Sequence, residues 1–256
     1  MTSSKNLACL AVAFSVLFGA GVQAEQQHLR IATEGTYPPF SYLQNGQLAG
    51  FDVDIANALC ERIQARCEIV SQGWDGMIPG LMSGKYDAIV ASMAITEERK
   101  QKIDFTDKYY ATPARFVAEK NSGITDTSVE GLAGKVIGVQ GSTTQGTYLE
   151  DRYKDSEVKI YKTVDDAAMD LASGRLDAVF SDSAILYPWL QTSIGSCCDF
   201  AGQEVRDEKY FGAGKGIGVR KEDQALRDQL DTAVKALVAD GTYQKINQKY
   251  FPFAIY

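Results

Sequence analysis

The sequence predicts an α/β protein of two similar lobes, each a mostly parallel sheet flanked by helices. The first observation is an internal repeat: residues 81–92 read LMSGKYDAIVAS and residues 171–182 read LASGRLDAVFSD. Each copy has the pattern of a helix end, a glycine stop, a basic residue, an aspartate and a short apolar strand. The second observation is that residues 29–35 and 135–141 both have the pattern of a strand that runs into a glycine-containing loop. Two similar α/β units are therefore expected.

Between these strands the hydrophobic period changes from 2 to 3.6, as βαβ units require. Apolar residues at helical spacing predict helices near residues 52–62 and 74–82 in the first half. In the second half they predict a helix over 163–173, followed by a strand at 177–180. Residues 223–240 predict a last helix that ends at a glycine and has a packing role. Helices that alternate with strands favour parallel sheets with helices on their faces.

Two extended stretches, residues 105–116 and 201–219, lie outside the repeated units. If the second unit is inserted between them, the chain crosses between lobes twice, and these crossings form a hinge. The predicted division is a first lobe over 25–112, an inserted second lobe over 113–206, and a return to the first lobe over 207–256.

The cleft between the lobes is the expected ligand site, because open α/β sheets bind ligands beyond the carboxyl ends of their strands. That rule selects the loops after Ala32, Val90, Val139 and Phe180.

Residues 1–24 have the pattern of an export signal. Lys5 supplies the positive start, residues 7–21 are apolar, and residues 22–24 (VQA) form a small-residue cleavage site, which places the cut after Ala24. A membrane anchor is the alternative, but the run is shorter than the roughly 20 apolar residues that a bilayer needs. A lipoprotein at Cys9 is less favoured because the apolar stretch continues beyond that cysteine. We expect a periplasmic protein that is soluble after cleavage.

Loss of Lys5 changes the formal charge from −7 to −8, and so acidic a protein is a poor nucleic-acid binder. Cys60 and Cys67 are close enough to pair in an oxidising compartment, in a loop worth about 2–3 kcal/mol; two buried thiols are the alternative. For the adjacent Cys197 and Cys198, a vicinal disulfide, two thiols and a solvent-exposed pair that arose by drift all remain open. No zinc site and no cofactor are expected, since His28 is the only histidine.

In the first lobe, Glu34 and Tyr37 follow the first strand, and Trp74 stands between glycines. The carboxylate could face a ligand cation while the rings cover an aliphatic stem or stack on a guanidinium. Alternatively, Glu34 is solvated and both rings are packing residues. Further along, Thr96 can cap a short helix, and Arg99 could bind a carboxylate through two parallel bonds. Alternatively, Arg99 is one more surface charge beside two glutamates.

In the second lobe, residues 141–146 (GSTTQG) form a polar loop that opens a helix and could hold an anion. Asp182 ends the repeated strand and could hold an ammonium group, although a helix N-cap is an equal alternative. Together these groups complement a zwitterionic amino acid. Catalysis is poorly served, because the sequence shows no Ser/His/Asp set, no P-loop and no metal cluster.

Over nearly the whole mature chain the sequence resembles the periplasmic amino-acid-binding proteins of ABC importers, closest to those for lysine, arginine, ornithine and histidine. The resemblance rests on several motifs and on Cys60 with Cys67 at the family's disulfide position. These motifs are residues 32–40 (ATEGTYPPF), 50–54 (GFDVD), 84–88 (GKYDA), 95–99 (ITEER), 141–144 (GSTT), 174–178 (GRLDA) and 240–243 (DGTY). The resemblance implies the two-lobed periplasmic-binding-protein fold of type II, with two hinge crossings.

By that resemblance Arg99 and the Thr144 amide would hold the ligand carboxylate, and Asp182 with the Ser92 region the α-amino group. Tyr37 and Trp74 would enclose the side chain, with Glu34 at its far end. Ala91 and Ala94 stand where basic-amino-acid binders of the family often carry serines, so some hydroxyl bonds would be missing. The implied ligand-binding set is Glu34, Tyr37, Trp74, Ser92, Ala94, Arg99, Thr144 and Asp182.

The expected function is therefore the periplasmic binding component of an amino-acid ABC importer that takes arginine, lysine, ornithine or histidine. The expected protein is a monomer that closes on its ligand and is then recognised by the membrane permease. Glu34 replaces an aspartate of several relatives and also resembles opine-binding ones, so an opine or another polar amino acid is an alternative ligand. A dehydratase-like enzyme on the same scaffold and a sensor are the alternative functions.

Overall fold

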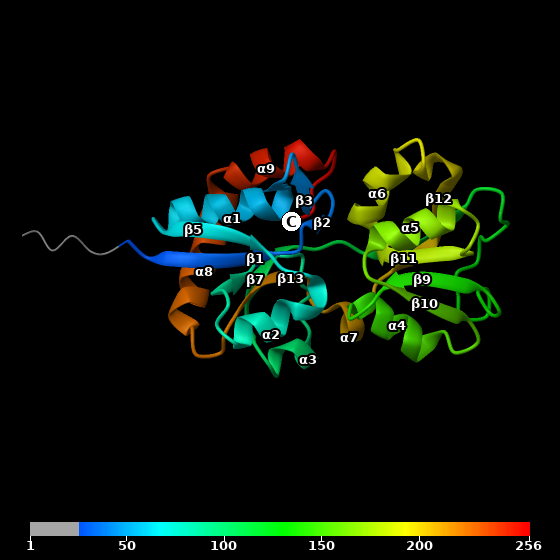
Figure 1. The fold of residues 1–256 in the computed structure, drawn as a ribbon, viewed down its shortest axis with the longest axis horizontal. Helices are drawn as coiled ribbons and strands as arrows, with labels where there is room; N and C mark the ends of the chain where they lie inside the picture. The colour runs from blue at the N-terminus through cyan, green and yellow to red at the C-terminus, as the bar shows by residue number, and fades with distance from the viewer. Residues whose placement is uncertain (1–25) are drawn as a thin grey trace, which may run out of the picture.

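The computed structural model describes residues 26–256, so the predicted signal peptide and its cleavage site lie outside the described residues. Within them the chain forms two sheet-centred lobes that lie side by side (Figure 1). The predicted α/β class with two mostly parallel sheets is confirmed. No helix of the described part is long and apolar enough to cross a membrane.

The first lobe is built on five strands: β1 (His28–Thr33), β5 (Arg66–Ser71), β6 (Ala88–Ile89), β7 (Asp104–Tyr110) and β13 (Lys215–Val219). Their order in the sheet is β5-β1-β6-β13-β7. Strands β5, β1 and β6 are parallel, whereas β13 runs antiparallel to both of its neighbours. A small three-stranded sheet lies beside it, made of β2 (Thr36–Tyr37), β3 (Ser41–Gln44) and β4 (Gln47–Ala49).

The second lobe repeats this plan with β8 (Ala114–Glu119), β9 (Val136–Gln140), β10 (Glu157–Tyr161), β11 (Ala178–Asp182) and β12 (Cys198–Val205). The order is β10-β9-β11-β8-β12, and β8 is the reversed strand. Because the parallel strands of each lobe end at the same edge of their sheet, their terminal loops are brought together.

The predicted helices are present in both lobes. The first lobe contains α1 (Phe51–Arg62), the 3-10 turn η1 (Trp74–Gly76), α2 (Met77–Met82), α3 (Glu97–Lys100), α8 (Gln224–Ala239) and α9 (Thr242–Tyr250). The second contains α4 (Thr144–Arg152), α5 (Val164–Ala172), α6 (Ser183–Leu190) and the 3-10 turn η2 (Gly195–Cys197). In α5, Val164, Ala168 and Leu171 are buried, as the helical period requires.

The aspartate of the repeated motif has the same structural role in both lobes. The backbone N–H of Arg30, on β1, donates to Asp87 Oδ2 at 2.9 Å, and the N–H of Asp87 donates back to the Arg30 carbonyl at 2.8 Å. In the second lobe Val136, on β9, and Asp177 exchange the corresponding bonds at 2.8 and 2.9 Å. This two-way bond ties the start of the first strand to the segment before the third.

The chain passes between the sheets twice, from Tyr110 to Ala114 and from Val205 to Lys215. The predicted boundaries after residues 112 and 206 fall inside these connections, and the division into domains stays a prediction. The second connection was expected to be extended, but it contains the short helix α7 (Glu208–Phe211). Asp207 caps α7 through the Lys209 N–H, and the Tyr210 hydroxyl donates to Asp151 of the second lobe at 3.0 Å. Capping and aromatic packing against this lobe therefore override the extended pattern.

The predicted disulfide between Cys60 and Cys67 is present and joins α1 to β5. Within the described range Cys197 and Cys198 are both free thiols, and Cys198 is buried, so the vicinal disulfide and the solvent-exposed pair are wrong.

Candidate functional site

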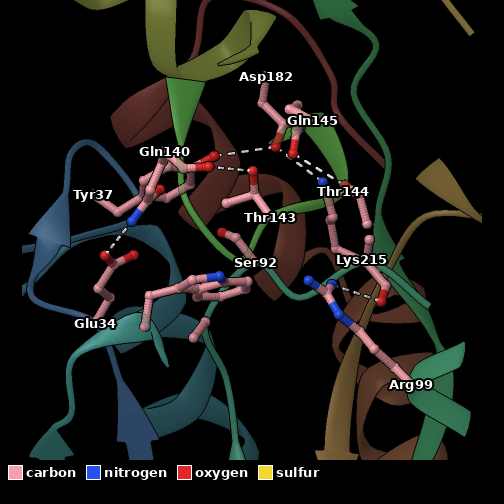
Figure 2. A pocket seen from close by; sticks show the side chains of 13 residues that line it. Glu34, Tyr37, Ser92, Arg99, Gln140, Thr143, Thr144, Gln145, Asp182 and Lys215 are labelled. Carbon is pink, nitrogen blue, oxygen red and sulfur yellow. Dashed lines mark hydrogen bonds and ion pairs between the residues drawn. The ribbon is translucent and has the colours of Figure 1, made fainter. Parts of the chain in front are cut away.

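A pocket lies between the lobes at the carboxyl ends of β1, β6, β9 and β11 (Figure 2). All eight residues predicted to bind ligand line it. Five further side chains complete the wall: Ala91, Gln140, Thr143, Gln145 and Lys215. The structure thus brings the predicted residues together from loops far apart in the sequence, while their individual roles toward a ligand stay predictions.

Glu34 is a buried carboxylate at one side of the pocket. Its residue is only 6% exposed, so the solvated interpretation is wrong. Its Oε1 accepts a hydrogen bond from Gln140 Nε2 of the second lobe at 2.7 Å and one from the Thr36 hydroxyl at 3.2 Å. Burial raises the pKa of Glu34 to about 6, against the opposing effect of these bonds. A cation beside Glu34 would favour the ionised form.

The two aromatic residues lie at the pocket and also bond across the cleft. Tyr37 is buried, and its hydroxyl donates to Asp182 Oδ2 at 3.1 Å. Trp74 is half-buried, and its indole Nε1 donates to the Ser142 carbonyl at 2.9 Å. Each ring therefore packs within the structure and also forms part of the pocket wall. The packing role and the pocket role that the sequence offered as alternatives are compatible.

Arg99 faces the pocket from the opposite side to Glu34 (Figure 2). The guanidinium donates to the Ala94 carbonyl at 3.1 Å and lies 5.3 Å from the centroid of the Trp74 ring. Thr96 caps α3 as predicted, since its Oγ1 accepts from the Arg99 N–H at 3.2 Å. Burial lowers the pKa of Arg99 to about 10, so the group is still charged at neutral pH. The surface-charge interpretation of Arg99 is wrong.

Asp182 is the most heavily bonded carboxylate of the pocket. It occupies the N-cap position of α6 but makes no capping bond, so the N-cap interpretation is wrong. Its Oδ2 accepts from Lys215 Nζ at 2.9 Å and from Tyr37, and its Oδ1 accepts from the Thr112 hydroxyl at 3.3 Å. Because Asp182 belongs to the second lobe and the other three to the first lobe or its connection, the carboxylate holds both lobes together.

Ser92 is held in a left-handed backbone conformation, φ 55°, by a buried network that sequence reasoning missed. Its N–H donates to the Tyr109 hydroxyl oxygen at 3.0 Å, and its own hydroxyl donates to Asp52 Oδ2 at 2.8 Å. Tyr109 in turn donates to Asp52 Oδ1 at 2.7 Å. Because the hydroxyl proton of Ser92 is committed to Asp52, its oxygen can only accept a bond from a group in the pocket. That polarity suits an ammonium group.

The polar loop of the second lobe reaches the pocket through the start of α4. Thr143 caps this helix, accepting from the Gly146 N–H at 3.0 Å, and Thr144 is its first residue. Gln140 was also missed, although it occupies in the second repeat the place that Glu34 has in the first. The alignment of Glu34 with Gln140 in the two repeated strands is the sequence signal that could have identified Gln140 as a pocket residue.

Lys215 is the other missed residue. Lys215 is the first residue of β13. The loop after β6 is bonded to this part of the chain on both sides of Lys215. The Ile95 N–H donates to the Gly214 carbonyl and the Gly216 N–H donates to the Met93 carbonyl, each at 2.9 Å. The lysine and Asp182 side chains are each about 5% exposed. Since β13 runs against the parallel strands, its first residue lies at the edge where the others end. The rule that ligands lie beyond the carboxyl ends of parallel strands does not select Lys215, because this residue is at the amino end of its strand.

The arrangement presents charge of both signs around a small pocket, with aromatic walls and backbone dipoles. No group of three or more His, Cys, Asp or Glu side chains within residues 26–256 could hold a metal ion. The site is suited to hold a small molecule with charges at both ends.

Comparison with known proteins gives one consistent result. The family model for bacterial extracellular solute-binding proteins, family 3, matches residues 29–253. An L-arginine-binding protein of Pseudomonas aeruginosa is 46% identical over 98% of each chain. A histidine-binding periplasmic protein of Escherichia coli K12 is 45% identical over 96% of each chain. A solved arginine-specific periplasmic binding protein of Salmonella typhimurium superposes with a TM-score of 0.81 at 32% identity, covering 88% of this chain and 99% of its own.

Proposed function

The chain belongs to the bacterial extracellular solute-binding proteins of family 3, and on that premise we propose that it is the binding component of an ABC importer for a basic amino acid. The observation that carries the proposal is the buried Glu34 carboxylate across the pocket from Arg99. An amino acid held by its carboxylate at Arg99 extends its side chain toward an acid, so a cationic end is favoured.

The geometry of the pocket supports the following proposed roles. Arg99 and the free N–H of Thr144, at the start of α4, hold the α-carboxylate. Asp182 and the accepting oxygen of Ser92 hold the α-amino group. Tyr37 and Trp74 cover the side-chain stem, and Ala94 fixes the Arg99 guanidinium through its carbonyl.

In this proposal the protein is exported to the periplasm, works as a monomer and binds no nucleic acid. Its lobes close on the ligand by hinge motion at the two connections, and the permease recognises the closed form. Binding without turnover is supported by the bonding of the charged groups: Glu34 accepts from Gln140, Arg99 donates to the Ala94 carbonyl, and Asp182 accepts from Lys215.

Calorimetric titration with arginine, lysine, ornithine, histidine and glutamate tests the proposal. We expect binding of at least one cationic amino acid and no comparable binding of glutamate. A protein that binds glutamate but no cationic ligand would contradict it, and turnover of prephenate or arogenate would favour the enzyme alternative.

The affinity for arginine should fall as the pH drops below about 6. The folded-state pKa of Glu34 is raised to about 6, so below that pH the carboxyl is protonated and loses its attraction for the guanidinium. The dissociation constant should rise by up to about tenfold per pH unit below 6 and level off above pH 7. Titrations from pH 5 to pH 8 measure this.

The Glu34→Gln variant is the control for this pH dependence. It should bind arginine more weakly at pH 7.5 and lose most of the dependence, since its amide does not titrate. A wild-type affinity that is the same at pH 5 and pH 7.5 would refute the assignment of Glu34 to the ligand cation.

A further inference from the structure

Asp52 is a buried carboxylate that the proposed binding scheme does not use. It lies at the start of α1, is 0% exposed and is not one of the residues that line the pocket. Its two oxygens accept from the hydroxyls of Ser92 at 2.8 Å and Tyr109 at 2.7 Å. Burial raises the pKa of Asp52 to about 6, against the opposing effects of these bonds and of the charge on Lys215. The carboxylate is therefore ionised at pH 7.5.

The directions of the hydroxyl protons in this network are set from its buried side. Tyr109 accepts from the Ser92 N–H at 3.0 Å, so its own proton is directed to Asp52. The Ser92 proton is directed to the other Asp52 oxygen, which leaves the lone pairs of the Ser92 oxygen for the pocket. Ser92 is the only hydroxyl residue of the segment 91–94 (ASMA). The polarity of that hydroxyl toward a ligand therefore depends on Asp52.

The charge balance of the site also depends on Asp52. Two carboxylates and two cations line the pocket, and their charges cancel: Glu34, Asp182, Arg99 and Lys215. Asp52, directly behind Ser92, gives the site one net negative charge, which matches the one net positive charge of arginine, lysine or ornithine. Without Asp52, binding would bury one uncompensated positive charge, which is costly in an interior of low dielectric.

This charge is needed near the α-amino end of the ligand. Asp182 is already paired with Lys215, whose Nζ lies 2.9 Å from Oδ2, and both side chains are about 5% exposed. Figure 2 shows Ser92 between Glu34 and Arg99, where the α-carbon of an amino acid that joins these two residues would lie. The carboxylate behind Ser92 is therefore the one whose charge no buried cation of the pocket pairs with directly.

We propose that Asp52 is a positioning residue for the ligand's α-ammonium group: it turns the Ser92 oxygen toward that group and supplies the buried charge that balances it. This inference rests on the proposed function, because it keeps Arg99 on the α-carboxylate and Glu34 on the side-chain cation. Asp52 acts through Ser92 and makes no contact with the ligand itself.

The test compares each cationic amino acid with an analogue that lacks only the α-amino group, by calorimetric titration at pH 7.5. The pairs are L-arginine with 5-guanidinopentanoate, L-lysine with 6-aminohexanoate, L-ornithine with 5-aminopentanoate and L-histidine with 3-(imidazol-4-yl)propanoate. Weak ligands are measured by competition against the preferred amino acid. Wild-type protein should bind that amino acid at least about a hundredfold more tightly than its analogue.

Asp52→Asn keeps the shape of the residue and removes its charge. The Tyr109 proton still points at position 52, so the amide oxygen faces Tyr109 and the amide NH2 faces Ser92. The Ser92 proton is then turned into the pocket, where it opposes an ammonium group. The amino acid should bind about thirtyfold or more weakly, whereas the analogue should bind within about threefold of its wild-type affinity or more tightly.

Ser92→Ala is the second variant, because it removes the oxygen between Asp52 and the ligand and leaves Asp52 in place. The amino acid should bind about tenfold more weakly and the analogue within about threefold of wild type. Asp54→Asn is the matched control. Asp54 also lies in the first turn of α1, but it accepts from Lys249 and Tyr250, each at 2.9 Å, outside this pocket. This control should bind every ligand as wild type does.

Thermal unfolding checks that each variant folds. A folded Asp52→Asn protein that keeps the wild-type preference, or that loses affinity for amino acid and analogue equally, overturns this inference and leaves the proposed function standing. If Asp52→Asn does not fold, Ser92→Ala decides by the same two criteria. A wild-type protein that binds no cationic amino acid overturns the proposed function as well.

Discussion

Replacement of Arg99 by methionine is expected to weaken binding of every ligand of this protein by about a hundredfold or more, or ~3 kcal/mol. The guanidinium is half-buried at the pocket and is held by the Ala94 carbonyl and the face of Trp74, so its geometry is set before a ligand arrives. A charged bidentate donor in a closed space gives one of the strongest contacts that a carboxylate can make. Calorimetric titration of the ligand panel measures the loss.

Arg99→Lys should fall between wild type and Arg99→Met, because an ammonium keeps the charge but cannot make two parallel bonds. The neighbouring Lys100→Met is the matched control, since that lysine is exposed and pairs only with Glu97 among the described residues. An Arg99→Met protein that keeps its affinity for all ligands would remove the carboxylate assignment.

Asp182→Asn is expected to lower both affinity and stability. The ligand loses its ammonium acceptor, at a cost of about a hundredfold in affinity. In addition, the buried ammonium of Lys215 loses its counterion, which should cost about 3 kcal/mol of unfolding free energy. Denaturant unfolding measures the second effect independently of ligand.

The double variant Asp182→Asn/Lys215→Met separates the two effects. It removes the unpaired buried cation, so most of the unfolding free energy should return, while the affinity should not. Asp155→Asn, an exposed aspartate of the same lobe, should change neither quantity. A single Asp182→Asn variant as stable as wild type would show that the buried pair contributes little to the fold.

The repeat was sufficient to predict the two sheets and the loops that form the pocket, because strand periodicity and glycine stops are local signals. The parallel ends of β1, β6, β9 and β11 follow from them. Most of the predicted ligand residues lie on these ends or in the segments after them, whereas Trp74 follows β5. Their bonding partners could not be predicted in the same way. Asp182 was expected to be open to a ligand, but it bonds to Tyr37 and Lys215 across the cleft.

The missed residues depend on contacts between distant parts of the chain. Lys215 reaches the pocket because a reversed strand starts where its neighbours end, and the sequence of that strand does not reveal its direction. Asp52 lies at the start of α1, where an acid is favoured in any helix. Only the fold places it beneath Ser92, with Tyr109 from a third segment completing the network.

The paired aspartates Asp87 and Asp177 have a consequence for how binding preference can change. Each completes its own sheet through bonds within one lobe, and neither of these bonds involves a residue that lines the cleft. Substitutions at the strand ends can then alter the chemistry of the captured molecule while both scaffolds keep their shape. A family whose two lobes each carry such an aspartate can change its ligand through substitutions at a few pocket positions.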